Sequence, residues 1–343
     1  MSSIFYIYII LAILSVIELI SSDKLIKTLV WFSASLCVLF TIGLGYQVGL
    51  DWVTYKDTYE GKIYTDSFEI FYNVLIAFLS RYISFWTFAI FVKVAYVFLL
   101  LKTIKTLCRL PTAAVTVFFA LSYPFVNDPL RQLIASSVFF IGFLLAKGYP
   151  RFYLVLLATG FHSSAMILLL GKLKFFKKQS IKFLFYSLAF SAFIAFALKN
   201  TTILGIISLF SASSSEKLSY YSSWSSISNI FSSFARIIIL GFSVYLGVKQ
   251  KEKFNNLQVA VYQLAFLMFV IEVASLGMPL FAQRVRLYLL PFTLILLMNG
   301  LTQKSMQYRF LSIMGVISYA GMSLYLFLSS DFKEYYQLQM NLL

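Results

Sequence analysis

The sequence predicts an all-α, polytopic integral membrane protein. Hydrophobic residues make up 60% of the 343 positions and charged residues only 12%, a composition that excludes a water-soluble globule. Apolar runs long enough to cross a hydrocarbon core, which takes about 20 helical residues, recur along the whole chain. The net charge of +15 is spread over several loops and forms no single patch, so we expect no nucleic-acid partner.

We expect residues 1–343 to form one transmembrane domain. Ten apolar runs predict ten transmembrane helices, at residues 4–21, 28–46, 84–104, 112–126, 132–147, 181–199, 230–248, 257–276, 286–300 and 309–329. The first run has no basic leader and no small-residue cleavage site, so we expect a retained helix and not a signal peptide.

Basic loops alternate with acidic loops along the chain, and the positive-inside rule places the basic ones in the cytoplasm. The basic loops contain Lys24, Lys27, Lys102, Lys105, Arg109, Lys147, Arg151, residues 172–182, Lys249, Lys251, Lys253, Lys304 and Arg309. The acidic loops contain Asp51, Asp57, Glu60, Asp66, Glu69, Asp128, Glu216, Asp331 and Glu334. This pattern predicts that both termini lie on the outer side.

One segment does not follow this alternation. Basic residues flank both ends of residues 149–178, but only one apolar run, residues 153–170, lies between them. A broken or re-entrant helix pair would explain the pattern, because the run contains Gly160 followed by "HSSA", and non-helical backbone at membrane depth occurs where it lines a cavity. The alternative is a full span followed by a basic outer loop.

The stretch "GLDWVTYKDTYEGKIYTDSFE" holds five of the thirteen acidic residues. Asp51, Tyr55 and Tyr59 are spaced to share one face of a helix. A carboxylate beside two phenol rings could bind or deprotonate a sugar hydroxyl. Alternatively, Asp51 caps a helix and the tyrosines belong to the interfacial aromatic belt; we favour the belt for the tyrosines and function for Asp51.

The next stretch, "FEIFYNVLIAFLSRY", predicts an interfacial amphipathic helix within an outer loop at residues 47–83. Its polar stripe would consist of Glu69, Asn73, Ser80 and Arg81. Such a helix could border a site that a lipid-linked substrate enters from the membrane, or it could only anchor the loop. A second outer loop, residues 211–228, is rich in serine and tyrosine.

The motif "NDPLRQLIASS" places Arg131 and Gln132 in the first turn of an outward helix. A cation beside the amide groups of a helix N-terminus can bind phosphate. Alternatively, Arg131 extends to the membrane surface or pairs with Asp128.

In "QRVRLYLLPF", Arg284 and Tyr288 are spaced to share a helical face, whereas Arg286 points elsewhere if the helix has already begun. Arginines at the outer edge of a membrane protein are costly and are usually functional.

The motif "GFHSSAM" contains His162, the only histidine, followed by Ser163. A single histidine is more often a core residue than a catalyst, but its position in the suspected helix break favours function. One histidine cannot build a zinc site, and Cys37 and Cys108 fall in different regions, so neither a zinc site nor a disulfide is expected.

The quoted motifs resemble the EpsG-like and Wzy-type family of bacterial polysaccharide polymerases over about residues 4–300. The resemblance is carried by "VGLDWVTYKDTY", "FEIFYNVLIAFLS", "RQLIASSVFFIGFLLAKGYPRFYLVLLATGFHSSAM" and "RVRLYLLPF". The family's motif positions correspond to Asp51, Arg131, His162 and an arginine at 284 or 286. Family members often carry an arginine just before the first motif, where this chain has Gly45 and Tyr46.

The resemblance implies an enzyme of the bacterial inner membrane. It would join oligosaccharide repeat units carried on polyprenyl diphosphate into O-antigen, capsule or exopolysaccharide, at the periplasmic face. The partners implied are these lipid-linked oligosaccharides, membrane lipids and a chain-length regulator protein, and a GT-C-like architecture is compatible with it. No cofactor is implied; divalent metal use stays open, since Asp51, Asp57 and Asp128 could supply oxygen ligands.

The residues suit glycosyl transfer from a diphosphate. Arginines would hold the leaving diphosphate, and Asp51 or His162 would activate the acceptor hydroxyl. A flippase or transporter of the same lipid-linked sugars is the second hypothesis, supported by Glu18 and Glu272 inside apolar spans, although no inverted repeat is evident. A membrane O-acetyltransferase using His162 is the third, but the second motif it would need is missing.

Overall fold

The computed structural model describes residues 3–49, 51–63, 68–146, 148–173, 176, 180–199, 227–250, 254–276 and 279–330. Within these ranges the chain is helical and contains no strand, which confirms the predicted all-α class. The helices are α1 Ser3–Ile20, α2 Lys24–Val38, η1 Leu39–Gly43, α3 Trp52–Tyr59, α4 Ile70–Leu79, α5 Phe85–Leu107, α6 Pro111–Val126, α7 Leu130–Ala146, α8 Phe152–Phe161, η2 Ser163–Lys172, α9 Ile181–Lys199, α12 Ile227–Gln250, α13 Asn256–Ala274, α14 Pro279–Leu301 and α15 Met306–Leu328.

Six helices within the described ranges are long and apolar enough to cross a membrane. They are Ser3–Ile20, Lys24–Gly43, Phe85–Leu107, Asn256–Ala274, Ala282–Leu301 and Met306–Leu328. The other four predicted spans fall on α6 and α7, which have 16 and 17 residues, and on α9 and α12, whose side chains are described only in part. The chain is therefore a multi-pass helical protein, and the number of ten spans stays a prediction.

Local signals in the sequence explain where several helices begin. The side chain of Ser84 accepts a hydrogen bond from the Thr87 N–H at the start of α5, and Asn255 forms a capping box with Gln258 at the start of α13. Such caps satisfy N–H groups that have no partner inside the helix.

An acidic residue of another helix caps α6. Pro111 occupies the first turn of α6, where its missing N–H is no loss. The Glu18 carboxylate of α1 accepts hydrogen bonds from the N–H groups of Thr112 and Ala113, both at 3.1 Å. This bond fixes α1 against α6 and gives a buried carboxylate its partners.

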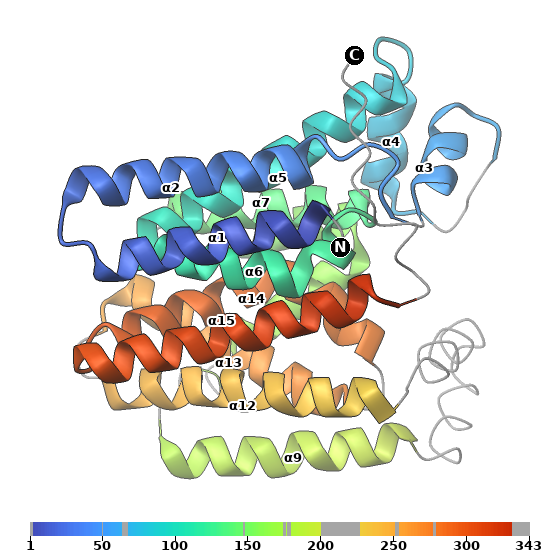
Figure 1. The fold of residues 1–343 in the computed structure, drawn as a ribbon. Helices are drawn as coiled ribbons and strands as arrows, with labels where there is room; N and C mark the ends of the chain where they lie inside the picture. The colour runs from blue at the N-terminus through green and yellow to red at the C-terminus, as the bar shows by residue number, and fades with distance from the viewer. Residues whose placement is uncertain are drawn as a thin grey trace.

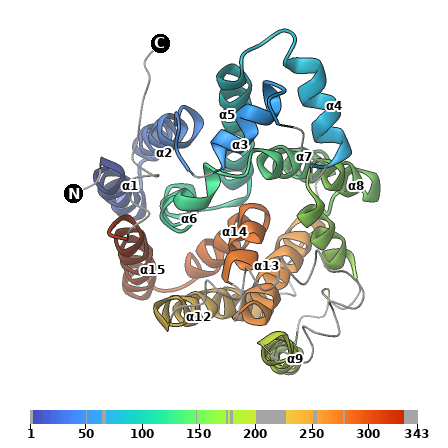
Figure 2. The ribbon, with the colours of Figure 1, turned by 90° about the vertical axis from the view of Figure 1, so that its right-hand side faces the viewer.

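Helix α14 lies at the centre of the bundle, with α6, α7, α12 and α13 around it (Figure 2). Pro291 lies inside α14 and cannot donate to the carbonyl of Leu287. The hydroxyl of Tyr96, on α5, donates to that carbonyl at 3.2 Å. A neighbouring helix thus supplies the hydrogen bond that the proline removes.

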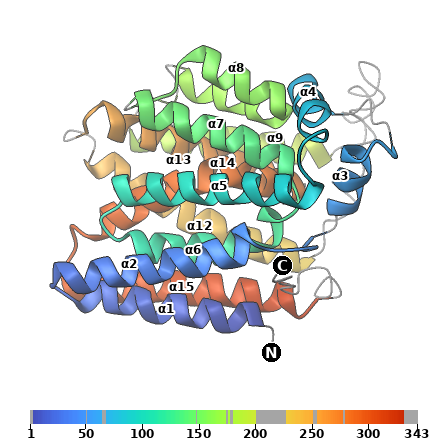
Figure 3. The same ribbon diagram turned by 90° about the horizontal axis from the view of Figure 1, so that it is seen from above.

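The axes of the long helices are roughly parallel to one another, and α3 and α4 lie at one end of the bundle (Figure 1). We call this end the α3–α4 end. The first residues of α1 and the last residues of α15 lie at the same end, whereas the turns that join α1 to α2 and α14 to α15 lie at the opposite end (Figures 1 and 3).

Candidate functional site

The segment with the unusual charge pattern forms a hairpin. Helix α8 ends at Phe161, the backbone of the next residue, His162, is extended (φ −157°, ψ 121°), and η2 runs back from it. The Tyr149 hydroxyl donates to the carbonyl of Leu168, and Lys172 Nζ lies 6.0 Å from the centre of the Tyr149 ring. Both ends of the hairpin therefore lie together, as the broken-helix alternative predicts and the single-span alternative does not. His162 sits at its tip.

The carboxylate of Glu69 gathers three donors at this tip. It accepts hydrogen bonds from Arg131 Nη1 at 2.6 Å, from His162 Nδ1 at 3.0 Å and from the Ser163 N–H at 2.9 Å. These groups come from α7 and the hairpin, while Glu69 stands at the N-cap position of α4. One side chain thus joins the start of α4, the first turn of α7 and the hairpin.

Glu69 is ionised over the whole physiological range. Burial acts to raise the pKa of its carboxyl, but the hydrogen bonds from His162 and Ser163 and the charge of Arg131 outweigh it and lower the pKa to about 2. Because its charge is already bound by three donors, Glu69 is a poor proton acceptor and a good orienting group.

Arg131 is enclosed by aromatic rings as well as by Glu69. Its guanidinium carbon lies 4.0 Å from the centre of the Phe68 ring, and its Nε donates to the Tyr55 hydroxyl at 3.4 Å. Its side chain is only 15% exposed. Arg131 is therefore a largely buried residue that neutralises Glu69 and packs against Phe68 and Tyr55.

Arg284 and Asp51 form a second, more open pair. Arg284 Nη2 lies 3.8 Å from Asp51 Oδ2, and the two side chains are 39% and 42% exposed. Asp51 stands at the N-cap position of α3, but its side chain makes no capping hydrogen bond, so the capping alternative is not what the structure shows. Its backbone N–H donates weakly to Asp128, at 3.5 Å.

The two tyrosines of α3 differ in their surroundings. Tyr55 joins the cluster through Arg131. The Tyr59 hydroxyl donates to the carbonyl of Ile83 at 3.0 Å, and its ring stacks on Phe88. Tyr59 is therefore a packing residue beside the site.

Gln132 and Tyr288 are buried, unlike the exposed pair Asp51 and Arg284. Gln132 Nε2 donates to the backbone carbonyl of Arg284, and its Oε1 is buried without a partner among the described residues. The Tyr288 hydroxyl lies 3.3 Å from Ser164 Oγ. Both residues connect α14 to the other elements of the site, and Ser163 contributes its backbone N–H.

Arg286 is not part of the Glu69 cluster or the Asp51 pair. Its Nη2 and Nε bond the two oxygens of Glu272 at 2.5 and 3.1 Å, and Arg236 Nε bonds the same carboxylate at 2.9 Å. All three residues are buried. Because α14 has begun before residue 284, Arg284 and Arg286 point to different faces, and only Arg284 reaches Asp51.

A buried lysine lies beside the first motif. Lys93 of α5 donates to the carbonyl of Gly45 at 3.0 Å and lies 3.5 Å from Asn127 Oδ1. The resemblance leads one to look for an arginine next to Gly45 and Tyr46; the cation that the structure places there is Lys93.

Helix α4 packs its Tyr72 and Ile76 inward and leaves a row of apolar side chains exposed. The exposed fractions of Ile70, Val74 and Phe78 are 76%, 64% and 59%. The exposed apolar face of α4 suits contact with lipid.

Of the residues expected to form its polar stripe, α4 contains only Asn73, because Glu69 precedes the helix and Ser80 and Arg81 follow its end. The polar stripe expected from these four residues is therefore not a face of α4, and Glu69 points into the cluster.

No group of three or more His, Cys, Asp or Glu side chains converges within the described ranges. Of the three aspartates that could have supplied oxygen ligands, Asp51 faces Arg284 and Asp57 lies 3.7 Å from Lys62 Nζ. The serine-rich loop at residues 211–228 falls almost wholly outside the described residues.

Sequence reasoning missed two residues of this site as candidates. The sequence pattern assigns Glu69 only to a polar stripe; its signal is an acidic residue directly before an apolar run, next to the family motifs. Lys93 lies inside an apolar span, where a charged residue is itself a sign of function.

Comparison with protein families gives one match. The model of the EpsG family matches residues 28–340. Neither a curated protein nor a solved structure matches the chain. The family match confirms the resemblance inferred from the motifs, and because it covers nearly the whole chain, the protein belongs to the EpsG family.

Proposed function

We propose that this protein polymerises oligosaccharide repeat units carried on polyprenyl diphosphate, by glycosyl transfer at the periplasmic face of the bacterial inner membrane. Membership of the EpsG family indicates a role in polysaccharide polymerisation in general. The observation that supports the specific reaction is the convergence of Asp51, Glu69, Arg131, His162 and Arg284 at one end of the helical bundle.

His162 is the proposed general base. Its Nδ1 is bonded to Glu69, which leaves the lone pair on Nε2 and fixes the orientation of the ring. The acceptor hydroxyl would give its proton to Nε2 while its oxygen bonds the anomeric carbon of the donor sugar. The bond from that carbon to the diphosphate breaks, and the diphosphate leaves with the electron pair.

Arg284 is the proposed ligand of the leaving diphosphate. Its side chain is 39% exposed, against 15% for Arg131, and its guanidinium can bind phosphate oxygens with two parallel hydrogen bonds. A diphosphate bound there would draw Arg284 away from Asp51 at 3.8 Å. Asp51 would then accept hydrogen bonds from hydroxyls of the acceptor sugar.

Helix α4 is the proposed entrance for the lipid-linked substrates. Its exposed row of Ile70, Val74 and Phe78 suits an isoprenoid chain or the membrane surface. Glu69, which starts the same helix, lies in the cluster. A substrate whose lipid lies along α4 would therefore present its diphosphate close to the site.

The transporter hypothesis loses its two supporting residues. Glu18 caps α6 through Thr112 and Ala113, and Glu272 is bound by two arginines. Both carboxylates have partners that explain their burial, so neither is needed as a proton or cation site.

The test uses the length distribution of surface polysaccharide in a deletion strain complemented with variants. Arg284→Ala should leave single repeat units and no ladder, because the leaving group loses its ligand, and Arg284→Lys should rescue only partly. Arg109→Ala, which changes an exposed arginine between α5 and α6, is the control and should give a full ladder.

Two outcomes would contradict the proposal. A full ladder from Arg284→Ala at normal membrane levels would exclude Arg284 from the reaction. Loss of even the single repeat unit from the cell surface would indicate transport, because a polymerase defect leaves translocated single units intact.

A further inference from the structure

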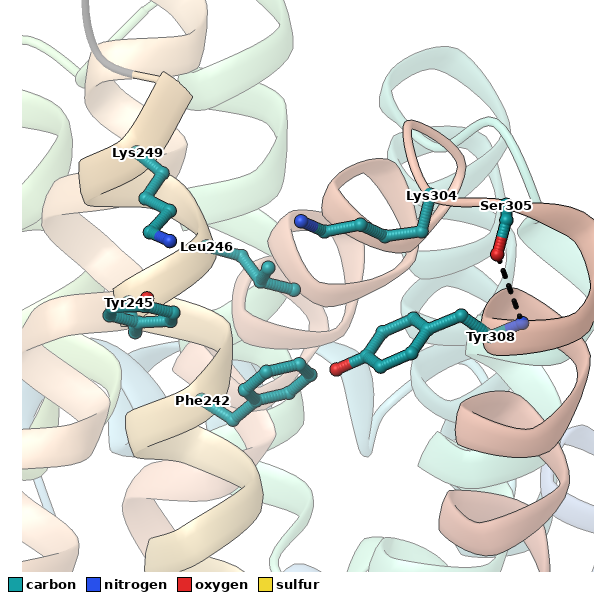
Figure 4. A pocket seen from close by; sticks show the side chains of 7 residues that line it. All are labelled: Phe242, Tyr245, Leu246, Lys249, Lys304, Ser305 and Tyr308. Carbon is teal, nitrogen blue, oxygen red and sulfur yellow. Dashed lines mark hydrogen bonds between the residues drawn. The ribbon is translucent and has the colours of Figure 1, made fainter.

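A pocket lies at the end of the bundle opposite the α3–α4 end, between α12 and α15. It has a volume of about 420 Å³ and is lined by Phe242, Tyr245, Leu246, Lys249, Lys304, Ser305 and Tyr308 (Figure 4). It shares no residue with the site around Glu69, and nothing in the proposed reaction uses it.

The rim of the pocket is positively charged. Lys249, in the last turn of α12, lies with its Nζ 4.8 Å from the centre of the Tyr245 ring. Lys304, in the turn before α15, extends toward α12 (Figure 4). None of the seven lining residues is acidic, so the two ammonium groups are not neutralised from within the pocket.

The start of α15 adds to this charge. Ser305 is the N-cap of α15, and its Oγ accepts a hydrogen bond from the Tyr308 N–H at 3.4 Å. The N-terminus of a long helix carries partial positive charge and N–H groups suited to an anion. The same pocket is therefore lined by two lysines and by the N-terminus of α15.

The inner wall of the pocket is apolar. Phe242 and Leu246 come from α12, and the ring of Tyr308 lies opposite Phe242 (Figure 4). One turn further into the bundle, Ile238 of α12 and Leu311 of α15 are 68% and 70% exposed. An apolar surface thus continues from the charged rim toward the middle of the membrane, as an acyl chain requires and a free anion does not.

We propose that this pocket binds an anionic phospholipid of the leaflet that the charge pattern assigns to the cytoplasm. Its phosphate bonds Lys249, Lys304 and the start of α15, and its acyl chains lie along Phe242, Ile238 and the facing side of α15. Basic pockets between membrane helices on the cytoplasmic side are suited to such headgroups. The lipid would hold α12 against α15.

The test is the midpoint of thermal unfolding of the purified full chain in detergent, titrated with phosphatidylglycerol, phosphatidylcholine or inorganic phosphate. A ligand that binds the folded state raises this midpoint. We expect phosphatidylglycerol alone to raise it. The double variant Lys249→Gln/Lys304→Gln should need about tenfold more phosphatidylglycerol for half of the shift, because two phosphate contacts are lost.

The matched control is Lys24→Gln/Lys102→Gln, which removes the same charge from exposed positions outside the pocket and should behave as the wild type. The charge reversal Lys304→Glu is a second test variant in case the double variant is unstable, and it should also weaken the response to phosphatidylglycerol.

An unchanged response in the pocket variants would overturn the proposal. An equal shift with inorganic phosphate would overturn the lipid as ligand, and an equal shift with phosphatidylcholine would overturn the requirement for an anionic headgroup.

Discussion

The Glu69 carboxylate holds His162, Arg131 and the Ser163 N–H at once. If it acts by orienting His162, the two residues form one functional unit. Glu69→Gln and His162→Gln should each reduce polymerisation strongly, and the double variant should be no worse than His162→Gln alone, because residues acting as a unit are not additive.

The measurement is polymerisation by purified protein from lipid-linked repeat units. Independent, multiplicative losses in the double variant would show that Glu69 does not act through His162. Thermal unfolding of each variant separates loss of activity from loss of the fold.

The pH dependence can be assigned to one of these two residues. The ordinary pKa of a glutamate carboxyl is about 4.5. A carboxylate whose pKa is lowered in the folded state stabilises the fold at any pH above that ordinary value, and this stability is lost as the pH falls toward the lowered pKa. For Glu69 that value is about 2, so Glu69 does not titrate between pH 5 and 8. The rate should fall on acidification as His162 gains a proton, and residual activity of His162→Gln should lack this acid limb. An unchanged acid limb in that variant would exclude His162 as the base.

Asp51 and Asp57 provide a matched pair of substitutions on α3. Asp51 faces Arg284, whereas Asp57 pairs with Lys62 at 3.7 Å. Asp51→Asn keeps the shape but removes the charge, so it should abolish long chains, while Asp57→Asn should give a normal ladder. Equal damage from both substitutions, or a normal ladder from Asp51→Asn, would show that the charge of Asp51 has no specific role in the reaction.

At the scale of elements, the contact between α4 and α8 sets the position of the site. Gly160 lies against the Phe71 ring, and a Cβ at residue 160 would overlap it. Gly160→Ala should therefore push α4 away from the hairpin, separate Glu69 from His162 and shorten the polymer. Adding Phe71→Ala should restore length, because it removes the ring that the new methyl group meets.

The control for this prediction is Gly315→Ala, a helical position where a Cβ would meet nothing within 4 Å. It should leave the ladder unchanged. If Gly160→Ala also leaves it unchanged, the close contact between α4 and α8 does not determine activity.

At the scale of the whole molecule, the site lies at the α3–α4 end, and the turns from α1 to α2 and from α14 to α15, where Lys24 and Lys304 lie, are at the opposite end (Figure 1). This arrangement predicts that residue 56 is exposed to the periplasm and residue 105 to the cytoplasm. In a chain without Cys37 and Cys108, an impermeant thiol reagent should label Lys56→Cys in intact spheroplasts, and Lys105→Cys only after permeabilisation. The reverse pattern would overturn the orientation and the periplasmic site with it.

Local patterns were sufficient for much of this protein. Helix periodicity and hydrophobicity predict the helices. Pro111 favours a helix start through its fixed φ and missing N–H, and Asn255 through its capping hydrogen bonds. Gly160 and the flanking charges allow either a helix break or a full span, and the structure has the break at His162. The family resemblance rests on four motifs, each a continuous stretch of sequence, and the family match confirms it.

The sequence by itself thus determined a helical, multi-pass chain of the EpsG family and most of the residues around its candidate site, since hydrophobic runs and motifs are local properties. Only the tertiary structure decided which charges pair: Glu69 with Arg131 and His162, and Arg286 with Glu272, which leaves Arg284 to face Asp51. The physical reason is that a buried charge must find its partner in space. Residues 69 and 162 are far apart along the chain, and the packing of α4 against the hairpin brings them within 3.0 Å.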